Sequence, residues 1–171
     1  MINTRGHWTG RLMNIKHTYA GDPLGRWTVI HMKGKGDTIV SIFSIYGVCN
    51  NIDGSNTAYV QQQNDLYDKH KQILDPRMQI IKDIQPVLAQ LVEKGHKIIV
   101  DADINDDAGC EFDNRWNSMM QELGLRNIIQ SQHHNKPLQS TYDRGKRCLD
   151  VIAVSGNIES KHILKCGILP F

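Results

Sequence analysis

Alternating apolar and polar residues predict two strands in the first third of the chain. Residues 26–32 ("RWTVIHM") and 38–46 ("TIVSIFSIY") are rich in β-branched and aromatic residues, which favour strands. The segment between them, "KGKGD" at 33–37, carries two glycines and predicts a hairpin turn. Both faces of the second strand are mostly apolar, so we expect this strand inside the sheet and not at its edge.

A change to three- and four-residue spacing predicts helices farther along the chain. One helix is expected from near Thr57 to Lys71, with Ser55 or Asn56 as its N-cap. The clearest helix covers residues 77–95, where Pro86 should kink or restart it and the terminal glycine should end it. Its apolar residues form one stripe: Ile80, Ile81, Ile84, Val87, Leu88 and Leu91.

Strands and helices continue to alternate towards the C-terminus. A third strand begins at 97–100, and residues 111–125 predict another helix, closed by a glycine. Residues 131–140 are expected to form a loop, residues 148–155 a strand, and residues 162–171 a final short strand. This order predicts an α/β domain, and the early hairpin makes its sheet mixed.

Composition limits the classes of protein to which the chain can belong. The 171 residues fit one domain spanning 1–171, although residues 1–26 show no clear pattern. Hydrophobic residues make up 40% and charged residues 22%, which excludes wholesale disorder. The net charge of +2 permits a nucleic-acid partner without indicating one.

The spacing of the cysteines and the lack of long apolar runs indicate in which cellular compartment we expect the protein. Four cysteines are widely spaced without a C-x-x-C pair, which argues against a zinc site or a disulfide framework. We therefore expect reduced thiols in an intracellular protein, nuclear or cytoplasmic. We expect no membrane partner and no secretory signal, because no apolar run approaches the ~18 residues of a membrane span.

The stretch "KIIVDADINDD", residues 97–107, is the strongest candidate for chemistry. If the strand stays extended, Asp101, Asp103 and Asn105 point to one face at its carboxyl end, where α/β proteins usually bind ligands. Carboxylates suit Mg²⁺, and an amide can donate to a developing negative charge. For Asp106 and Asp107 we favour a capping role in the turn.

Three segments in order resemble the endonuclease/exonuclease/phosphatase superfamily, which has the DNase I-like fold. Residues 102–105 ("ADIN") resemble the Gly-Asp-Phe-Asn-type element that ends a central strand in that family. Residues 140–155 ("STYDRGKRCLDVIAVS") are similar to its Thr-Tyr segment, basic turn and Ile-Asp-Tyr-type strand, and residues 44–50 ("SIYGVCN") to its tyrosine-bearing strand. The resemblance covers residues 27–171. Some short segments within it resemble endonuclease modules in retroelement-derived reading frames.

This resemblance implies a fold, an activity and a cofactor. The fold would be a partial DNase I-like layered β-sandwich with mixed sheets, flanked by helices. The function would be metal-dependent phosphoester hydrolysis with Mg²⁺ or Mn²⁺, as a nuclease acting on DNA or RNA. Two alternatives stay open: a phosphatase for inositol phosphates or other small phosphoesters, and a degenerate non-catalytic domain that binds nucleic acid or protein.

The same resemblance implies roles for individual residues. Asp103 would bind the metal and activate water, Asn105 would steady the phosphate, and Asp150 would orient a histidine. Tyr46 would donate to a phosphate oxygen or the leaving group, with a packed aromatic as an equal alternative. The implied substrate-binding residues are Asn50, Thr141, Arg144, Lys146 and Arg147, of which the basic three could equally be surface charge. We prefer a functional role for Asp150, because a carboxylate inside an apolar strand needs a partner.

The sequence also departs from the family pattern. No glutamate precedes Glu93, and Asn3 and Asn14 have no strand context, so the early Asn and metal-binding Glu are lacking. The terminal Ser-Asp-His element is not reached by Phe171. We therefore expect a domain truncated at both ends, with weak or no activity, an exposed sheet edge and self-association. Asp101-Ala102-Asp103 could also occupy the motif in place of Asp103-Ile104-Asn105, with an aspartate where the family has the asparagine.

Overall fold

The computed structural model describes most of the chain: residues 2, 4–13, 22–106, 115–132, 140–141, 145, 147–158 and 163. These residues form an α/β fold with a mixed five-stranded sheet and helices, which confirms the predicted fold class. One sheet, and so one layer of the expected sandwich, lies within this part of the chain. No helix of the described part is both long enough and apolar enough to cross a membrane.

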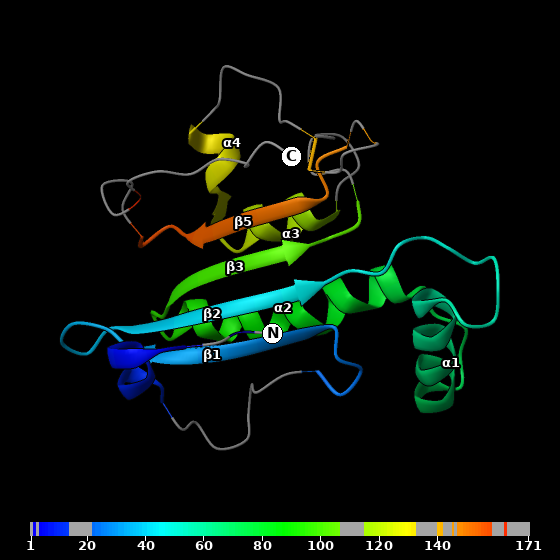
Figure 1. Ribbon diagram of the computed structural model, residues 1–171, viewed down its shortest axis with the longest axis horizontal. Coiled ribbons are helices and arrows are strands. Elements are labelled where there is room, and N and C mark those ends of the chain that lie inside the picture. Colours follow the sequence, from blue (N-terminus) through cyan, green and yellow to red (C-terminus); the bar gives the residue numbers. More distant parts are fainter. Residues whose placement is uncertain are drawn as a thin grey trace.

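The sheet has the order β1-β2-β3-β5-β4 (Figure 1). Its strands are β1 (Trp27–Lys33), β2 (Ile39–Tyr46), β3 (Lys97–Asp103), β4 (Leu125–Asn127) and β5 (Asp150–Ser155). Only β2 and β3 pair in parallel, and the other three pairs are antiparallel. The predicted hairpin and the interior position of β2 are both confirmed.

In the described part of the chain five helices accompany the sheet: η1 (Gly6–Arg11), α1 (Ala58–His70), α2 (Pro76–Glu93), α3 (Arg115–Glu122) and α4 (Ile128–Gln132). The predicted N-cap of α1 is wrong. Thr57 takes that position, and its side chain accepts a hydrogen bond from the backbone of Val60. Its hydroxyl also donates to the Asn51 carbonyl at 2.8 Å, which ties the helix start to the preceding loop.

Helix α2 runs through Pro86 and does not restart there. An interior proline costs about 3 kcal/mol, whereas each large apolar side chain that is buried contributes about 1.5–3 kcal/mol. Five large apolar residues of this helix are buried: Ile80, Ile81, Ile84, Leu88 and Leu91. The packing of the stripe therefore outweighs the lost backbone bond, and Gly95, with φ +74°, ends the helix as predicted.

Three short elements were not predicted: η1, β4 and α4. Strand β4 has only three residues and α4 only five, too few for a periodic pattern to show. The expected loop at 131–140 begins inside α4, and its residues 133–139 lie outside the described part. The start of the helix expected at 111–125 and nearly all of the strand expected at 162–171 also lie outside it.

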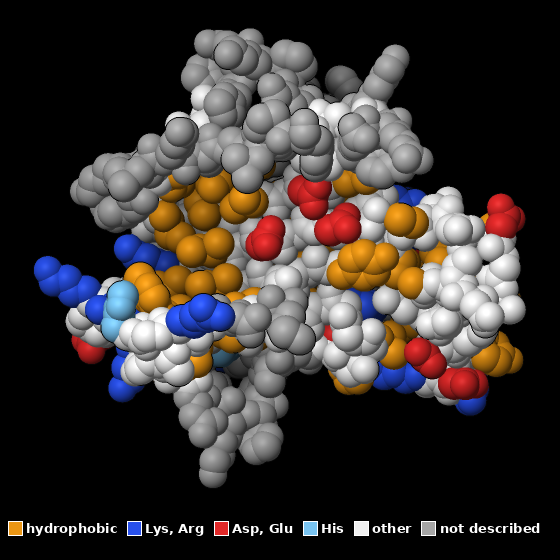
Figure 2. Space-filling model, in the orientation of Figure 1, with side chains coloured by type: hydrophobic (Ala, Val, Ile, Leu, Met, Phe, Trp, Pro, Cys, Tyr) orange, Lys and Arg blue, Asp and Glu red, His pale blue; other side chains and the backbone are white. Residues whose placement is uncertain are grey.

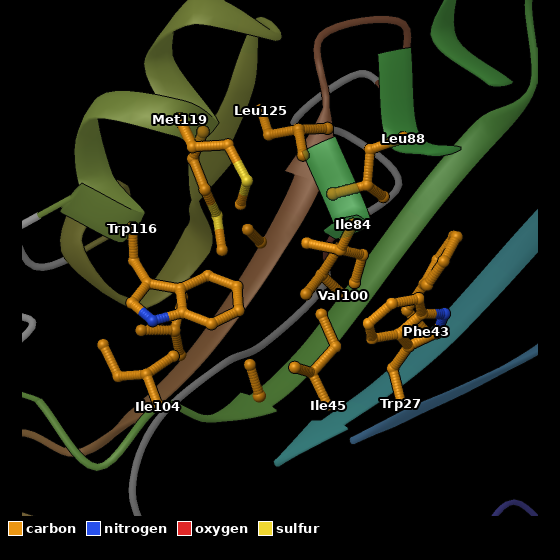
Figure 3. Packing of buried hydrophobic residues seen from close by; sticks show 14 of the residues in the cluster. Trp27, Phe43, Ile45, Ile84, Leu88, Val100, Ile104, Trp116, Met119 and Leu125 are labelled. Atoms are coloured by element: carbon orange, nitrogen blue, oxygen red, sulfur yellow. The ribbon is translucent and has the colours of Figure 1, made fainter. Parts of the chain in front are cut away.

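The hydrophobic core lies between one face of the sheet and the helices α2 and α3 (Figure 3). Ile84 and Leu88 of α2 and Trp116 of α3 belong to the same buried cluster as Val100 at the centre of the sheet. Phe43, Leu88 and Val100 have no exposed surface. This packing holds β2 and β3 firmly against the helices, so their carboxyl ends have fixed positions.

The opposite face of the sheet is less completely covered. Ile42, Ile99 and Ile152 point to this face and are partly exposed. A smaller cluster around Ile128 of α4 packs against two of them, Ile99 and Ile152. Figure 2 shows this face, with apolar side chains over one part of it and acidic side chains gathered beside them.

Candidate active site

Three of the predicted residues form one row across the sheet. Tyr46 ends β2 and pairs with Asp103 at the end of β3, and Asp103 pairs with Asp150 at the start of β5. Residues directly opposite on neighbouring strands share a face, and their Cβ atoms lie about 5 Å apart. The row follows from the sheet register and not from loop geometry.

Asp101 occupies a different row. It pairs with Ser44 on one side and with Ile152 on the other. Asp101 is on the same face as Asp103 but two residues further back along β3. The residue that lies beside Tyr46 is therefore Asp103.

The strand does not stay extended to Asn105, and that part of the prediction is wrong. β3 ends at Asp103, and Asn105 has φ +48° in the left-handed region. Asparagine tolerates this region better than most residues because its short polar side chain can bond locally. Its backbone N–H donates to Asp103 Oδ1 at 3.3 Å, so the turn brings the carboxamide back to the row.

Gly47 permits the close contact between the ends of β2 and β3. Its N–H donates to the Asp103 carbonyl at 2.7 Å, and its carbonyl accepts from Asn105 Nδ2 at 2.7 Å. A Cβ atom at this position would lie 2.6 Å from the Ile104 carbonyl oxygen, within the contact distance of the atoms. Only glycine fits here without a backbone shift.

Thr141 holds the start of β5 through its side chain. Its Oγ1 accepts hydrogen bonds from the N–H groups of Leu149 at 2.8 Å and Asp150 at 3.2 Å. The Ile104 N–H in turn donates to the Leu149 carbonyl at 2.8 Å, which joins this segment to β3. Thr141 thereby fixes the backbone that carries Asp150.

Asp150 is exposed, so our argument from burial is wrong for it. It is the first residue of β5 and faces solvent, and its neighbour across the ladder is another carboxylate. The sequence pattern was misleading because the apolar run of the strand begins only at Val151.

The other predicted binding residues lie near the row or outside the described part. Asn50 is exposed in the segment after β2, and Arg147 is exposed with its carbonyl accepting from the Thr141 N–H at 3.3 Å. Arg144 and Lys146 are outside the described residues.

The electrostatics of the row favour protonated forms. Burial and the Asp150 carboxylate raise the pKa of Asp103, and the hydrogen bonds with Asn105 offset part of this rise. Burial raises the pKa of the Tyr46 phenol, and the charges of Cys49 and Asp103 add to the effect. A carboxylate with a raised pKa is a better proton acceptor near neutral pH, and the phenol stays protonated there.

A metal ion would find two protein carboxylates here. No group of three His, Cys, Asp or Glu side chains in the described residues could hold one. Asp103 and Asp150 oppose each other with like charge, and a cation between them would relieve that repulsion. Mg²⁺ usually takes one or two carboxylates and completes its shell with water and substrate phosphate, so this pair fits it.

A cavity of about 410 Å³ adjoins Tyr46 on the side of β1. Polar groups of its lining include Thr28, Ser44 and Tyr46, and apolar ones include Ile2 and Ile30. The two carboxylates of the row are not part of this lining. Tyr46 therefore places one end of the row at the rim of this cavity.

Sequence patterns missed two contributors, Gly47 and Cys49. The Cys49 thiol donates to Asn105 Oδ1 at 2.9 Å. A glycine directly after an apolar strand that ends in tyrosine was a signal for close backbone approach. Nothing in the sequence indicated that residues 49 and 105 meet, since their contact depends on the parallel pairing.

Comparison with known proteins finds similarity to solved structures alone. No protein-family model and no curated protein matches the sequence. Several solved structures are similar to the chain, at low identity and with TM-scores below 0.5.

Three structures illustrate this similarity. The 3′ phosphatase NExo from Neisseria, bound to a product DNA hairpin, has 17% identity and a TM-score of 0.47 over 80% of this chain and 54% of its own. The endonuclease domain of TRAS1, a telomere-specific non-LTR retrotransposon, has 13% identity and a TM-score of 0.45, covering 78% and 52%. The human nocturnin catalytic domain with bound sulfate has 11% identity and a TM-score of 0.44, covering 76% and 40%.

The chain thus spans about half the length of these structures, or less. At such identities and TM-scores the similarity carries no statement about the class of fold, activity, substrate or partner of this chain.

Proposed function

We propose that the chain carries the catalytic row of a metal-dependent phosphoester hydrolase whose substrate is the phosphodiester backbone of DNA or RNA. One observation carries the proposal: the sheet register aligns Tyr46, Asp103 and Asp150 on one face. They lie at the same edge of the sheet, where β2 and β3 end and β5 begins. Perturbed titratable groups that converge at the carboxyl edge of an α/β sheet are typical of functional sites.

Each residue of the row has a role that its environment supports. Asp103, with its raised pKa, accepts a proton from the attacking water. Asp150 strengthens the basicity of Asp103 through its charge. Tyr46 keeps its proton at neutral pH and donates to a phosphate oxygen or to the leaving group. Asn105 donates an amide N–H to the phosphate, on which negative charge develops.

Mg²⁺ or Mn²⁺, held by Asp103 and Asp150, would neutralise the charge of the phosphate when bound. The two carboxylates lie at the ends of different strands, so the sheet register and not a flexible loop sets their separation.

The test is a plasmid-nicking assay with Mg²⁺, performed on the full chain and on a version extended at both ends. Asp103→Asn should abolish nicking, whereas Asp101→Asn is the matched control because it removes an aspartate from the same strand and face. A larger loss in the Asp101 variant would instead favour the alternative position of the motif. Failure of both the chain and its extended version to cut DNA or RNA would sink the proposal.

A second candidate is a non-catalytic domain that binds nucleic acid or protein. The observation that favours it is the lack of a third metal-binding carboxylate or imidazole among the described residues. This candidate predicts that Asp103→Ala leaves the affinity for a DNA duplex unchanged or raises it, since a negative charge is removed. Loss of affinity in this variant would contradict it.

Self-association through an exposed sheet edge is also part of the proposal. Strands β1 and β4 are the outer strands. The edge of β1 is partly occupied, because Leu12 bridges to Met32 and the Met13 N–H donates to the His31 carbonyl at 2.8 Å. Size-exclusion chromatography should show species larger than a monomer, and a sharp monomer peak with cooperative melting would contradict this.

A further inference from the structure

The carboxamide of Asn105 is held at both of its ends. Its Nδ2 donates to the Gly47 carbonyl at 2.7 Å, and its Oδ1 accepts from the Cys49 thiol at 2.9 Å. Both partners belong to the segment that follows β2, whereas Asn105 belongs to the turn after β3. The parallel pairing of the two strands brings these segments together.

The two contacts restrain different atoms of the amide. The bond to Gly47 holds the Nδ2 end of the amide, and the bond to Cys49 holds the Oδ1 end. A turned amide would place Oδ1 against the Gly47 carbonyl, acceptor against acceptor, and Nδ2 against the Cys49 S–H, donor against donor. With both partners present, only one orientation satisfies every group. The second amide hydrogen then keeps a fixed direction.

We infer that Cys49 is a positioning residue for Asn105: its thiol fixes the carboxamide so that the second amide hydrogen is directed to a bound phosphate. This inference rests on the proposed function, which puts a phosphate beside Asn105. It assigns a role to a side chain that does not itself touch the substrate.

Burial does not explain the presence of Cys49. Its side chain is exposed, whereas Cys148, the other described free cysteine, is buried in the core beneath β5. A cysteine is usually a small buried apolar residue, and Cys148 follows that pattern. Cys49 adds little apolar burial, and its side chain instead donates a hydrogen bond to Asn105.

The experiment compares Cys49→Ser, which keeps a donor, with Cys49→Ala, which does not. Side-chain amide signals are recorded by ¹H–¹⁵N NMR on the full chain, and an Asn105→Ala variant identifies the Asn105 pair by its disappearance. Wild type and Cys49→Ser should give Asn105 amide protons displaced from their random-coil shifts. In Cys49→Ala the pair should move towards the random-coil shifts of a solvent-exposed asparagine amide.

A titration with inorganic phosphate in the presence of Mg²⁺ supplies the second readout. Loss of one neutral hydrogen bond corresponds to an affinity change of roughly 3- to 10-fold, so Cys49→Ala should bind phosphate weaker by about that factor. Cys49→Ser should restore most of the affinity. Thermal midpoints should stay the same in all three proteins, because the site of substitution is exposed.

The outcomes separate this inference from the proposed function. An Asn105 amide pair that is unchanged in Cys49→Ala overturns the positioning role, whatever the phosphate titration shows. If neither wild type nor its version extended at both ends binds phosphate or cuts nucleic acid, the proposed function falls, and the amide signals alone decide whether Cys49 orients Asn105. If wild type does bind phosphate, equal affinity in Cys49→Ala also overturns the inference.

Discussion

The polar side chains at the amino ends of strands β2 and β3 interact differently from those at the carboxyl ends. At the amino end, Ser41 is fully buried and joins two buried histidines, His31 and His96, through hydrogen bonds of 2.8 Å each. At the carboxyl end, Asp103 faces a second carboxylate, Asp150. At the first end the Ser41 hydroxyl joins the two imidazole rings by hydrogen bonds, whereas the carboxylates at the second end repel.

This difference separates stability from function within one pair of strands. Buried polar groups that are matched cost little and rigidify the fold. Unmatched like charges cost stability, and proteins keep them where a ligand or a reaction uses the charge. The amino end therefore anchors the strands, and the carboxyl end presents the candidate active site.

The largest expected effect is the loss of the anchor. Ser41→Ala removes the common partner of two buried imidazole rings, and we expect a loss of about 2–4 kcal/mol in the free energy of unfolding, since buried polar atoms lose their bonds. The measurement is urea denaturation. Ser44→Ala is the matched control, because it makes the same change on the same strand at a partly exposed position on the other face, and it should cost under ~0.5 kcal/mol. Equal effects of the two variants would remove the distinction between the ends.

The next largest loss of stability is expected from a substitution at the carboxyl end of the strands. It would prevent the close approach of the backbones that follow β2 and β3. Gly47→Ala puts a Cβ atom 2.6 Å from the Ile104 carbonyl oxygen, and we expect a cost of about 1–3 kcal/mol from the forced shift. In the same urea denaturation the control Gly10→Ala should have nearly the stability of wild type, because no atom lies within 4 Å of a Cβ there. A Gly47→Ala protein with wild-type stability would mean that this end of the strands is not closely packed.

The two ends should also respond to pH with opposite signs. Burial lowers the pKa of His31 and of His96 below the ordinary value of 6.5, with smaller effects from His96 on the first and from Lys94 on the second. The unfolded chain therefore binds protons more readily, and this contribution to stability is complete above pH 6.5 and is lost as the pH falls. Each net proton changes the free energy of unfolding by about 1.4 kcal/mol per pH unit.

At the other end the sign reverses. The pKa of Asp103 is raised above 3.8 in the folded state, so its contribution to stability grows as the pH falls through the folded value and is complete below 3.8. Urea denaturation at a series of pH values should show a shallower acid loss in His96→Gln. Asp103→Asn should show a steeper net loss, because the compensating gain is gone. Parallel profiles for wild type and both variants would contradict this assignment.

The smallest expected effect is a gain. Asp103→Asn removes one of two opposed charges, and we expect the free energy of unfolding to rise by about 0.2–1 kcal/mol at neutral pH, the usual size of a cross-strand pair effect. Asp101→Asn is the control, because Asp101 faces Ser44 and Ile152 and no carboxylate across the ladder. Destabilisation by Asp103→Asn would mean that its bonds with Asn105 outweigh the repulsion.

Sequence patterns predicted most of the sheet because its strands carry strong local signals. The apolar runs of β2 and β3 and the stripe of α2 are long enough for their periods to show. β4 and α4 are too short for that, and packing against β5 defines them instead. Thr57 was overlooked as an N-cap because two other capping residues, Ser55 and Asn56, precede it directly.

The candidate site was predictable only in part, for a similar reason. The alternation along β3 placed Asp103 on the correct face, and the family resemblance added Tyr46 and Asp150. The turn that returns Asn105 to the row depends on a left-handed backbone conformation that alternation does not predict. The contact of Cys49 with Asn105 spans 56 positions and depends on the strand register.

The parallel register of β2 and β3 has a practical consequence for engineering the chain. Tyr46 meets Asp103 through the ladder, so the long crossover between them, with α1 and α2, does not set their distance. Its link between the two helices includes Ile73, which is 79% exposed, and a reporter peptide inserted there should leave the row intact. A single residue added within β3 would instead turn its aspartates towards the helices.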